Sequence, residues 1–371
     1  MEVKKKFKKF LDRFTSTDRI LITGGMGYIG SHTAVEFIQA GYDVCIVDNL
    51  TNSNIEVLNG IEQITGKRPA FENIDCTDYV AMDRFLNKYD DIKCIIHFAA
   101  FKAVGESVES PLRYYRNNLL SLINLLELMP IHEIPGIVFS SSCTVYGQAK
   151  RLPVDENTPI QKALSPYGNT KQICEEILQD TIKANPNIHS VILRYFNPIG
   201  AHPTSLIGEF PNGVPNNLIP FITQTAAGIR KELKVFGDDY NTPDGSCIRD
   251  YIDVVDLAKA HVKAVERILD NNIQKTEIYN LGTGRGYSVL EIIRAFEEAN
   301  NIKIPYKIVE RRAGDIEQVW ADPTKANKTL GWKADTPMTE TLRNAWKWQC
   351  HLTKRSEGKD YSRLNFIMHG S

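Results

Sequence analysis

The chain has 371 residues, a length that suits one large domain or two closely packed ones. With 42% hydrophobic and 24% charged residues it has the composition of a soluble globular protein, and a formal net charge of -1 gives no indication of nucleic-acid or membrane binding. The seven cysteines form neither a C-x-x-C pair nor a metal-type pairing with histidine. This pattern favours reduced thiols in a cytoplasmic protein without a metal site.

The first fourteen residues, MEVKKKFKKFLDRF, are basic and place apolar side chains at helical spacing. They lack the apolar core and the cleavage site of a secretory signal. We expect residues 1–18 to form a basic N-terminal extension, either a surface helix or a frayed arm. Docking on an anionic membrane or on a partner is the alternative for this segment.

From residue 19 onward, strand-like and helix-like patterns alternate. Short apolar runs predict strands at 19–24, 42–48, 70–75, 92–100, 136–142 and 190–196. Helical rhythm predicts helices near 29–40, 55–65, 78–88, 106–129 and 166–184. Such alternation is typical of a parallel sheet that is covered on both faces. We therefore predict an α/β fold with a Rossmann-type doubly wound parallel sheet over residues 19–196.

The amino-acid composition changes after Phe196. Residues 197–217 are rich in Pro, Gly and Asn, which predicts a long ordered loop. Residues 197–350 are expected to form mainly a smaller C-terminal α/β domain that binds the substrate, followed by a tail at 351–371. An amphipathic helix at 253–269 and a strand at 277–282 are candidates for elements that return to the first domain, over about 250–282.

A glycine-rich turn, TGGMGYIG, follows the first strand and opens the first helix. Gly24, Gly27 and Gly30 permit a tight turn and let the backbone approach a pyrophosphate at the helix N-terminus. Asp48 ends the second strand, where a carboxylate accepts hydrogen bonds from an adenosine ribose and repels a 2′-phosphate. In this strand–turn–helix context the pattern predicts a bound NAD, and a ligand-free glycine turn would leave Asp48 unexplained.

The segment SPYGNTK places Tyr167 in the first turn of a helix and Lys171 one turn further on the same face. A nearby ammonium and a positively charged nicotinamide ring both favour a phenolate, so the pair with NAD⁺ predicts a base that deprotonates a sugar hydroxyl. Ser142, at the carboxyl end of the fifth strand, is placed to relay the proton or to hold the hydroxyl. A solvated helix face is the alternative for Tyr167 and Lys171.

Together these residues resemble the extended short-chain dehydrogenase/reductase family. Longer strings, among them HFAAFKAVGESV, SSSCTVYG, LRYFNPIGAHP, PNNLIPF and RRAGDIEQVWAD, resemble its UDP-glucose 4-epimerase branch, from about residue 19 to 349. The resemblance implies a catalytic set of Ser142, Tyr167 and Lys171. It implies NAD contacts from Gly24, Gly27, Tyr28, Ile29, Gly30, Asp48, Asn49, Asn52, Ser53, Asp75, Phe98, Ala99, Ala100, Lys102, Asn117, Tyr167, Lys171 and Phe196. It implies UDP-hexose contacts from Lys102, Ser142, Asn197, Asn217, Leu218, Val235, Phe236, Arg249, Tyr251, Arg312, Asp315 and Val319.

The reaction implied by the resemblance is inversion at C4 of a UDP-hexose, through oxidation, turning of a 4-keto sugar and re-reduction with tightly held NAD. Val319 stands where some relatives carry a bulky tyrosine, so we also predict activity on N-acetylated UDP-hexoses. Ala100 stands where many relatives have glycine. The family further implies a homodimer formed by the helices at 106–129 and 166–184.

Two other functions compete with the epimerase. A nucleotide-sugar 4,6-dehydratase shares the glycine turn and Y-x-x-x-K, but elimination of water needs an extra acid–base pair, and SSSCTVYG carries no carboxylate beside Ser142. A non-enzymatic NAD sensor on the same fold would have no need of both Tyr167 and Lys171, and this chain keeps both.

Overall fold

The computed structural model describes residues 18–357 apart from 212, 271–272 and 313–314. The basic extension expected at the N-terminus therefore lies outside the described residues except for its last one. Residues 358–371 of the expected C-terminal tail also lie outside them. The last described helix, α11 (Met338–Glu357), continues past residue 350, where that tail was expected to begin.

The largest part of the fold is a seven-stranded sheet whose neighbouring strands all run parallel, in the order β10-β6-β5-β4-β1-β2-β3. Its strands are β1 (Arg19–Thr23), β2 (Asp43–Asp48), β3 (Ala70–Asn73), β4 (Ile92–His97), β5 (Gly136–Ser142), β6 (His189–Tyr195) and β10 (Thr276–Leu281). The chain winds from β1 outward to β3 and then returns to β4 on the other side of β1. Sheets of this kind bind ligands at that switch point, beyond the carboxyl ends of the strands.

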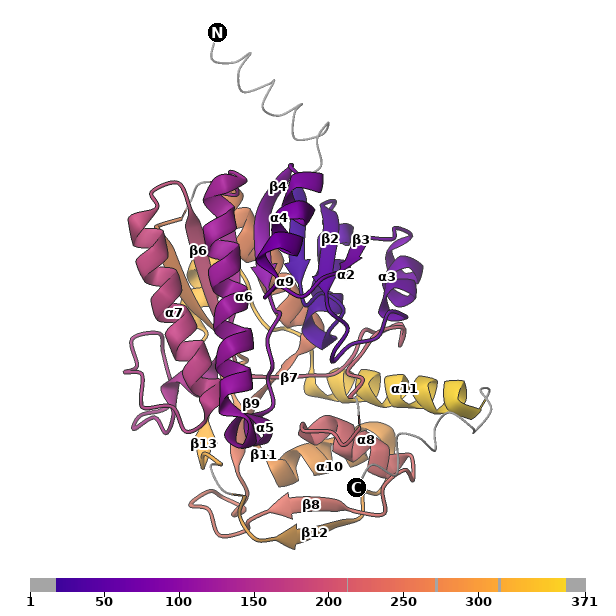
Figure 1. Cartoon of the computed structure of the whole chain (residues 1–371). Coiled ribbons are helices and arrows are strands. Elements are labelled where there is room, and N and C mark those ends of the chain that lie inside the picture. The colour runs from indigo at the N-terminus through magenta and orange to yellow at the C-terminus, as the bar shows by residue number, and fades with distance from the viewer. Residues whose placement is uncertain (1–17, 212, 271–272, 313–314, 358–371) are drawn as a thin grey trace.

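Helices cover both faces of the sheet, as its buried strands require (Figure 1). One face is covered by α2 (Tyr28–Gln39), α3 (Val57–Thr65) and α9 (Val254–Leu269), and the other by α4 (Tyr79–Lys88), α6 (Pro111–Ile131) and α7 (Pro166–Ala184). Along β1, Ile20 and Ile22 face the first layer while Leu21 faces the second, because successive strand residues point to opposite faces. The predicted doubly wound parallel sheet is confirmed.

The prediction of a single long helix at 106–129 is wrong. The structure has two helices there, α5 (Val104–Glu109) and α6, separated by Ser110 with φ -131° and ψ 61°. Pro111 explains the break, because a proline has no N–H to continue a helix and disfavours the helical conformation in the residue before it. Pro111 instead occupies the first position of α6, which suits its fixed φ.

A smaller second part lies beyond the carboxyl ends of the large sheet (Figure 1). Its elements are β7 (Asn197–Ile199), α8 (Leu218–Ala226), β8 (Leu233–Phe236), β9 (Ile248–Asp253), β11 (Gly286–Ser288), α10 (Val289–Asn300), β12 (Tyr306–Val309), β13 (Gln318–Val319) and α11. The segment expected to be a loop at 197–217 begins with a short strand, β7, which pairs with β9. Helix α9 and strand β10, which follow β9 in sequence, belong to the large sheet layer, where α9 packs against α2.

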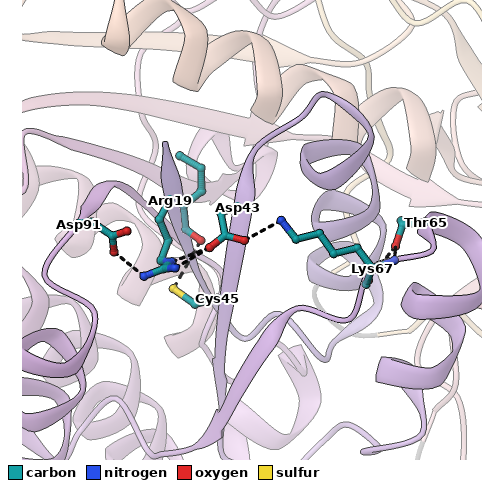
Figure 2. Close-up of polar contacts among 7 residues, drawn as sticks. Arg19, Asp43, Cys45, Thr65, Lys67 and Asp91 are labelled. Carbon is teal, nitrogen blue, oxygen red and sulfur yellow. Dashed lines mark hydrogen bonds and ion pairs between the residues drawn. The ribbon is translucent and has the colours of Figure 1, made fainter. Parts of the chain in front are cut away.

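Charged side chains connect the amino ends of the sheet strands (Figure 2). Arg19 donates through Nε to Asp43 at 2.8 Å and through Nη1 to Asp91 at 2.5 Å. Lys67 binds the other carboxylate oxygen of Asp43 at 2.7 Å. Because these side chains are partly exposed, each pair contributes only about 0–1 kcal/mol. The network lies at the opposite end of the strands from the ligand-binding edge, so its role is structural.

All seven cysteines lie within the described residues, and each is a free thiol. In the same part of the chain, no helix combines the length and the apolarity needed to cross a bilayer. The described residues also contain no group of three or more His, Cys, Asp or Glu side chains arranged to hold a metal ion.

Candidate active site

The turn between β1 and α2 is shaped by glycines that approach other backbone closely. Gly24 has φ +69°, and a Cβ on it would lie 2.8 Å from the backbone nitrogen of Ala99. A Cβ on Gly30 would lie 2.4 Å from the carbonyl oxygen of Gly24. Gly27 is the N-cap of the twelve-residue α2, and no side chain caps the first amides of that helix. A helix N-terminus without a side-chain cap, behind a turn whose only side chain, that of Met26, is buried in the core, fits the pyrophosphate of a dinucleotide.

Polar side chains next to this turn form the adenosine side of the candidate site. Asp48, at the end of β2, accepts hydrogen bonds from the backbone of Met26 at 3.1 Å and of Leu50 at 2.9 Å, and from Ser53 Oγ at 2.8 Å. Asn49 donates to Asp75 at 3.0 Å. The structure thus groups four of the predicted cofactor residues on one side of the glycine turn, while the neighbouring Asn52 is exposed.

The three predicted catalytic residues come from the end of β5 and the start of α7. Ser165 caps α7 by accepting a hydrogen bond from the amide of Gly168 at 3.1 Å, which places Tyr167 in the first helical turn. Ser142 Oγ accepts a hydrogen bond from the amide of Thr144 at 3.2 Å, and its hydroxyl lies near enough to Tyr167 to lower the pKa of that phenol. Lys171 Nζ donates to the carbonyl oxygen of Ser140 at 2.6 Å. The structure therefore brings the hydroxyls of Tyr167 and Ser142 together and ties the ammonium to the same strand.

Burial has the largest effect on the pKa values of Tyr167 and Lys171. It raises the pKa of Tyr167 to about 12, against the lowering effect of the nearby Ser142 hydroxyl. Burial likewise lowers the pKa of Lys171 to about 8, while Cys174 and Glu175 act in the opposite direction. Lys171 is thus mainly an ammonium at neutral pH, and Tyr167 keeps its proton. A phenolate at Tyr167 therefore requires a positive charge beyond those of the surrounding side chains.

The predicted nicotinamide side follows the carboxyl end of β4. The amide of Phe98 donates to Thr23 at 3.0 Å, and its ring lies 4.9 Å from the ring of His261. Ala99 meets the glycine turn directly, and Ala100 follows it on the same loop. Phe196 is buried directly after β6, and its amide donates to the carbonyl of Leu281. These residues surround the edge of the sheet where Tyr167 and Ser142 lie.

Strand β9 organises part of the predicted substrate site. Its register places Arg249 opposite Val319 of β13 and Tyr251 opposite Asn197 of β7. Val319 is 2% exposed and packs in one cluster with Phe196, so it lies beside the predicted nicotinamide side. Val319 therefore joins the two predicted halves of the site.

The remaining predicted substrate residues flank this strand. Arg312 binds Asp315 through two nitrogens, at 2.8 and 3.2 Å, and its guanidinium carbon lies 5.6 Å from the centre of the Phe236 ring. Asn217 is the N-cap residue of α8 and Leu218 begins that helix. Two of the predicted substrate residues, Val235 and Tyr251, have side chains that are buried in the hydrophobic core of the second part.

Sequence reasoning missed two polar residues at this site. Glu209 accepts a hydrogen bond from Asn217 Nδ2 at 2.6 Å and lies 3.8 Å from Lys102 Nζ, so it connects two predicted substrate contacts. Asn118 is buried and binds both the N–H and the C=O of Phe101, at 2.8 and 3.0 Å. The repeated asparagine in YYRNN was a usable signal for Asn118. Glu209 lies in an irregular loop whose contacts no periodicity indicates.

Comparison with known proteins agrees with this geometry. A family profile described as GDP-mannose 4,6 dehydratase matches residues 21–345. A UDP-glucose 4-epimerase of Dictyostelium discoideum is 52% identical over 332 residues, which cover 90% of this chain and 96% of the relative. The UDP-glucose 4-epimerase of Homo sapiens is 46% identical over 338 residues, with the same two coverages of 90% and 96%.

Solved structures give the same result. The UDP-glucose 4-epimerase from Bifidobacterium longum, in complex with NAD+ and UDP, has a TM-score of 0.86 and 48% identity, covering 92% of this chain and 100% of that one. The enzyme from Stenotrophomonas maltophila, with bound NAD and formylated UDP-arabinopyranose, has a TM-score of 0.88 and 45% identity, covering 91% and 99%. By these similarities, which extend over the glycine turn and the catalytic candidates alike, the chain belongs to the UDP-glucose 4-epimerase family.

Proposed function

We propose that this protein is an NAD-dependent isomerase that inverts C4 of UDP-hexoses and so interconverts UDP-glucose and UDP-galactose. The observation that carries the proposal is the proximity of Ser142 and Tyr167, with Lys171 one turn further along α7, at the carboxyl edge of the sheet. NAD, when bound, supplies a hydride acceptor and donor for the sugar carbon and a positive charge close to the phenol.

The residues around the glycine turn fit NAD. The turn and the start of α2 would hold its pyrophosphate, and the polar group around Asp48 would hold its adenosine. An ionised carboxylate offers about four acceptor positions. Asp48 uses three of them on protein donors, so one is left for a ribose hydroxyl. A 2′-phosphate would meet the negative charge of Asp48, which makes NAD the preferred cofactor over NADP.

Tyr167 moves the proton in this proposal. The protein by itself holds the pKa of the phenol at about 12, and the positive charge of a bound NAD⁺ would lower it. Tyr167 then takes the proton of the sugar 4-hydroxyl, directly or through Ser142, and returns it at the end of the cycle. Lys171, fixed by the Ser140 carbonyl, keeps its ammonium close to the reacting groups. Between the two proton transfers the sugar, in its 4-keto form, rotates within the pocket so that its other face is presented.

Arginines hold the diphosphate while the sugar turns. Arg249 on β9 and Arg312 present guanidinium groups, whose planar fork suits phosphate oxygens. Asp315 orients Arg312 through a two-point contact. Phe236 is 39% exposed beside Arg312, and packs against the uracil or its ribose. Anchoring through the nucleotide leaves the hexose free to present either face.

Val319 sets the size of the sugar that the site accepts. Its small side chain lies in the cluster that contains Phe196 and contacts the half-buried Cys143, directly after Ser142. A tyrosine at this position would project extra volume toward the sugar. We therefore propose that the protein also interconverts UDP-N-acetylglucosamine and UDP-N-acetylgalactosamine. If the wild type does not turn over the N-acetylated sugar, this part of the proposal is wrong.

We further propose that the protein is a homodimer through α5, α6 and the start of α7. Val104, Val108, Leu112 and Leu164 are 49–77% exposed there, and exposed apolar patches of this kind mark interfaces. Light scattering after size exclusion should give the mass of a dimer, and Leu112→Glu should shift it toward that of a monomer. A monomeric wild type would contradict the assignment.

A cytoplasmic location is proposed on the basis of the seven free cysteines, which suit a reducing compartment. A fluorescent fusion of the full chain, imaged in its native cell, tests this. Fluorescence confined to a membrane-bounded secretory compartment would contradict the proposal.

The decisive assay incubates purified protein with UDP-galactose without added NAD and measures UDP-glucose by chromatography. Turnover is expected, because the cofactor is regenerated in each cycle and remains bound. A stable 4-keto-6-deoxy product would instead identify a 4,6-dehydratase, for which Cys143 and Thr144 supply no carboxylate beside Ser142. Bound NAD without any turnover would identify a sensor.

A further inference from the structure

We propose that the buried ion pair of Glu175 and Arg194 is a positioning device for the reaction, which fastens the strand that carries Ser142 to the helix that carries Tyr167 and Lys171. The inference rests on the proposed function, since it assigns a role within the same site. Neither partner has a hydrogen bond to a predicted substrate or cofactor contact, and Glu175 acts on Lys171 only through its charge, so both are positioning residues and not catalytic ones.

The first support is the spacing along α7. Tyr167, Lys171 and Glu175 follow one another at intervals of four residues, so they lie on one face of the helix over two turns. Lys171 and Glu175 are 5% and 1% exposed. The face of α7 that delivers the two predicted catalytic groups therefore continues into a buried carboxylate.

The second support is the set of bonds that this carboxylate makes to the sheet. Ser141 of β5 and Arg194 of β6 are paired in the strand register. Glu175 Oε1 accepts from Ser141 Oγ at 2.5 Å and from Arg194 Nε at 3.0 Å, while Oε2 accepts from Arg194 Nη2 at 2.6 Å. One side chain from the helix thus holds two neighbouring strands, and one of its partners directly precedes Ser142.

The third support comes from the other end of Arg194. Its Nη1 donates to the hydroxyl of Tyr146 at 2.9 Å, and that hydroxyl donates to Asn280 Oδ1 at 2.6 Å. Tyr146 ends the short 3-10 helix η1 (Cys143–Tyr146), which begins directly after Ser142. Ser142 is therefore held between two anchors, Ser141 before it and Tyr146 after it, and both lead to the same ion pair.

Stability alone does not account for this pair. Desolvation of two buried charges offsets most of their attraction, so a buried ion pair can often be replaced by apolar side chains without loss of stability. Two-point geometry, in contrast, fixes position, and a displacement of about 1 Å in a reacting group can reduce the rate about 100-fold. The main contribution of the ion pair is therefore to fix the position of Ser142 relative to Tyr167.

The test replaces both charges together, as Glu175→Met with Arg194→Met, so that no unpaired charge stays buried. With UDP-galactose as substrate, kcat should fall about 10- to 100-fold. KM and the amount of bound NAD should stay within about threefold of wild type. The matched control is Glu277→Met with Arg267→Met, because that pair also bonds through two nitrogens and includes a tyrosine hydroxyl, from Tyr279, but lies away from Ser142 on α9 and β10.

A double variant that keeps wild-type kcat with NAD bound would overturn the proposal, as would an equal loss in the control pair. Should the double variant fail to fold, Ser141→Ala decides the question, because it removes one anchor and leaves the ion pair intact. A kcat at least about threefold below wild type at unchanged Tm would support the positioning role, and an unchanged kcat would overturn it. A wild type without epimerase activity would overturn the proposed function and this role with it.

Discussion

Replacing Lys171 by methionine should make the protein more stable and inactive. Burial lowers the pKa of this lysine from 10.5 to about 8. One pKa unit corresponds to about 1.36 kcal/mol, so keeping the ammonium buried costs the folded state about 3 kcal/mol at neutral pH. Methionine keeps the apolar stem, removes the charge and gives up the hydrogen bond to Ser140, which offsets about 1 kcal/mol. The variant should therefore be about 2 kcal/mol more stable at pH 7, a rise of a few degrees in Tm.

The pH dependence of that gain identifies its cause. Below pH 8 the lysine is protonated in both the folded and the unfolded chain, and the full cost is present. Between pH 8 and 10.5 the folded chain has released the proton while the unfolded chain still binds it, so the stability of the wild type rises with pH. Above 10.5 the cost has disappeared. The Tm advantage of the methionine variant should therefore be largest at pH 7 and nearly absent at pH 10.

Differential scanning calorimetry of both proteins from pH 7 to 10, at matched NAD content, measures this difference. Lys93→Met, at an exposed position of β4, controls for the loss of any lysine charge. The variant should also lose about 10²- to 10⁴-fold in kcat on UDP-galactose, the usual range for a group that assists proton transfer. A Lys171→Met variant that is less stable than wild type at every pH, or a difference in Tm that does not change with pH, would show that the buried ammonium does not destabilise the fold.

Three further changes test other parts of the site. Gly30→Ala should reduce bound NAD at least about tenfold in the purified protein, because its Cβ would lie 2.4 Å from the Gly24 oxygen; normal NAD content would contradict the shape of the turn. Val319→Tyr should lower kcat/KM for UDP-N-acetylglucosamine about 100-fold and leave that for UDP-galactose within about threefold, whereas equal losses would argue against a size limit. Arg312→Leu should raise KM at least about tenfold with little change in kcat, and an unchanged KM would exclude it from the diphosphate site.

Local patterns were sufficient to predict the large sheet. Five of its first six strands contain short apolar runs, as burial on both faces requires, whereas the edge strand β3, with the sequence AFEN, is only partly buried. The break before Pro111 was also visible in the sequence, but helical rhythm on both sides of it led us to expect one helix. Strand β10 joins the sheet edge beside β6 although it comes more than 80 residues later, a pairing that only the assembled fold specifies.

The site was predictable to the extent that its residues sit in motifs. The glycine turn and the Y-x-x-x-K spacing each fix a local geometry, so their members could be named from the sequence. Contacts between residues that are distant in the sequence could not be predicted. Examples are the contact of Glu209 with Asn217 and that of Glu175 with Arg194. The pKa of Tyr167 belongs to the same class, because its burial depends on several segments that are distant in the sequence.

The role of the Tyr167 phenol in proton transfer is best tested by turnover of UDP-galactose by Tyr167→Phe, with its fold and bound NAD verified beforehand. We expect a loss of at least about 10²-fold in kcat, because the variant has no hydroxyl to exchange a proton with the sugar. Wild-type turnover by a folded, NAD-loaded Tyr167→Phe protein would contradict that role.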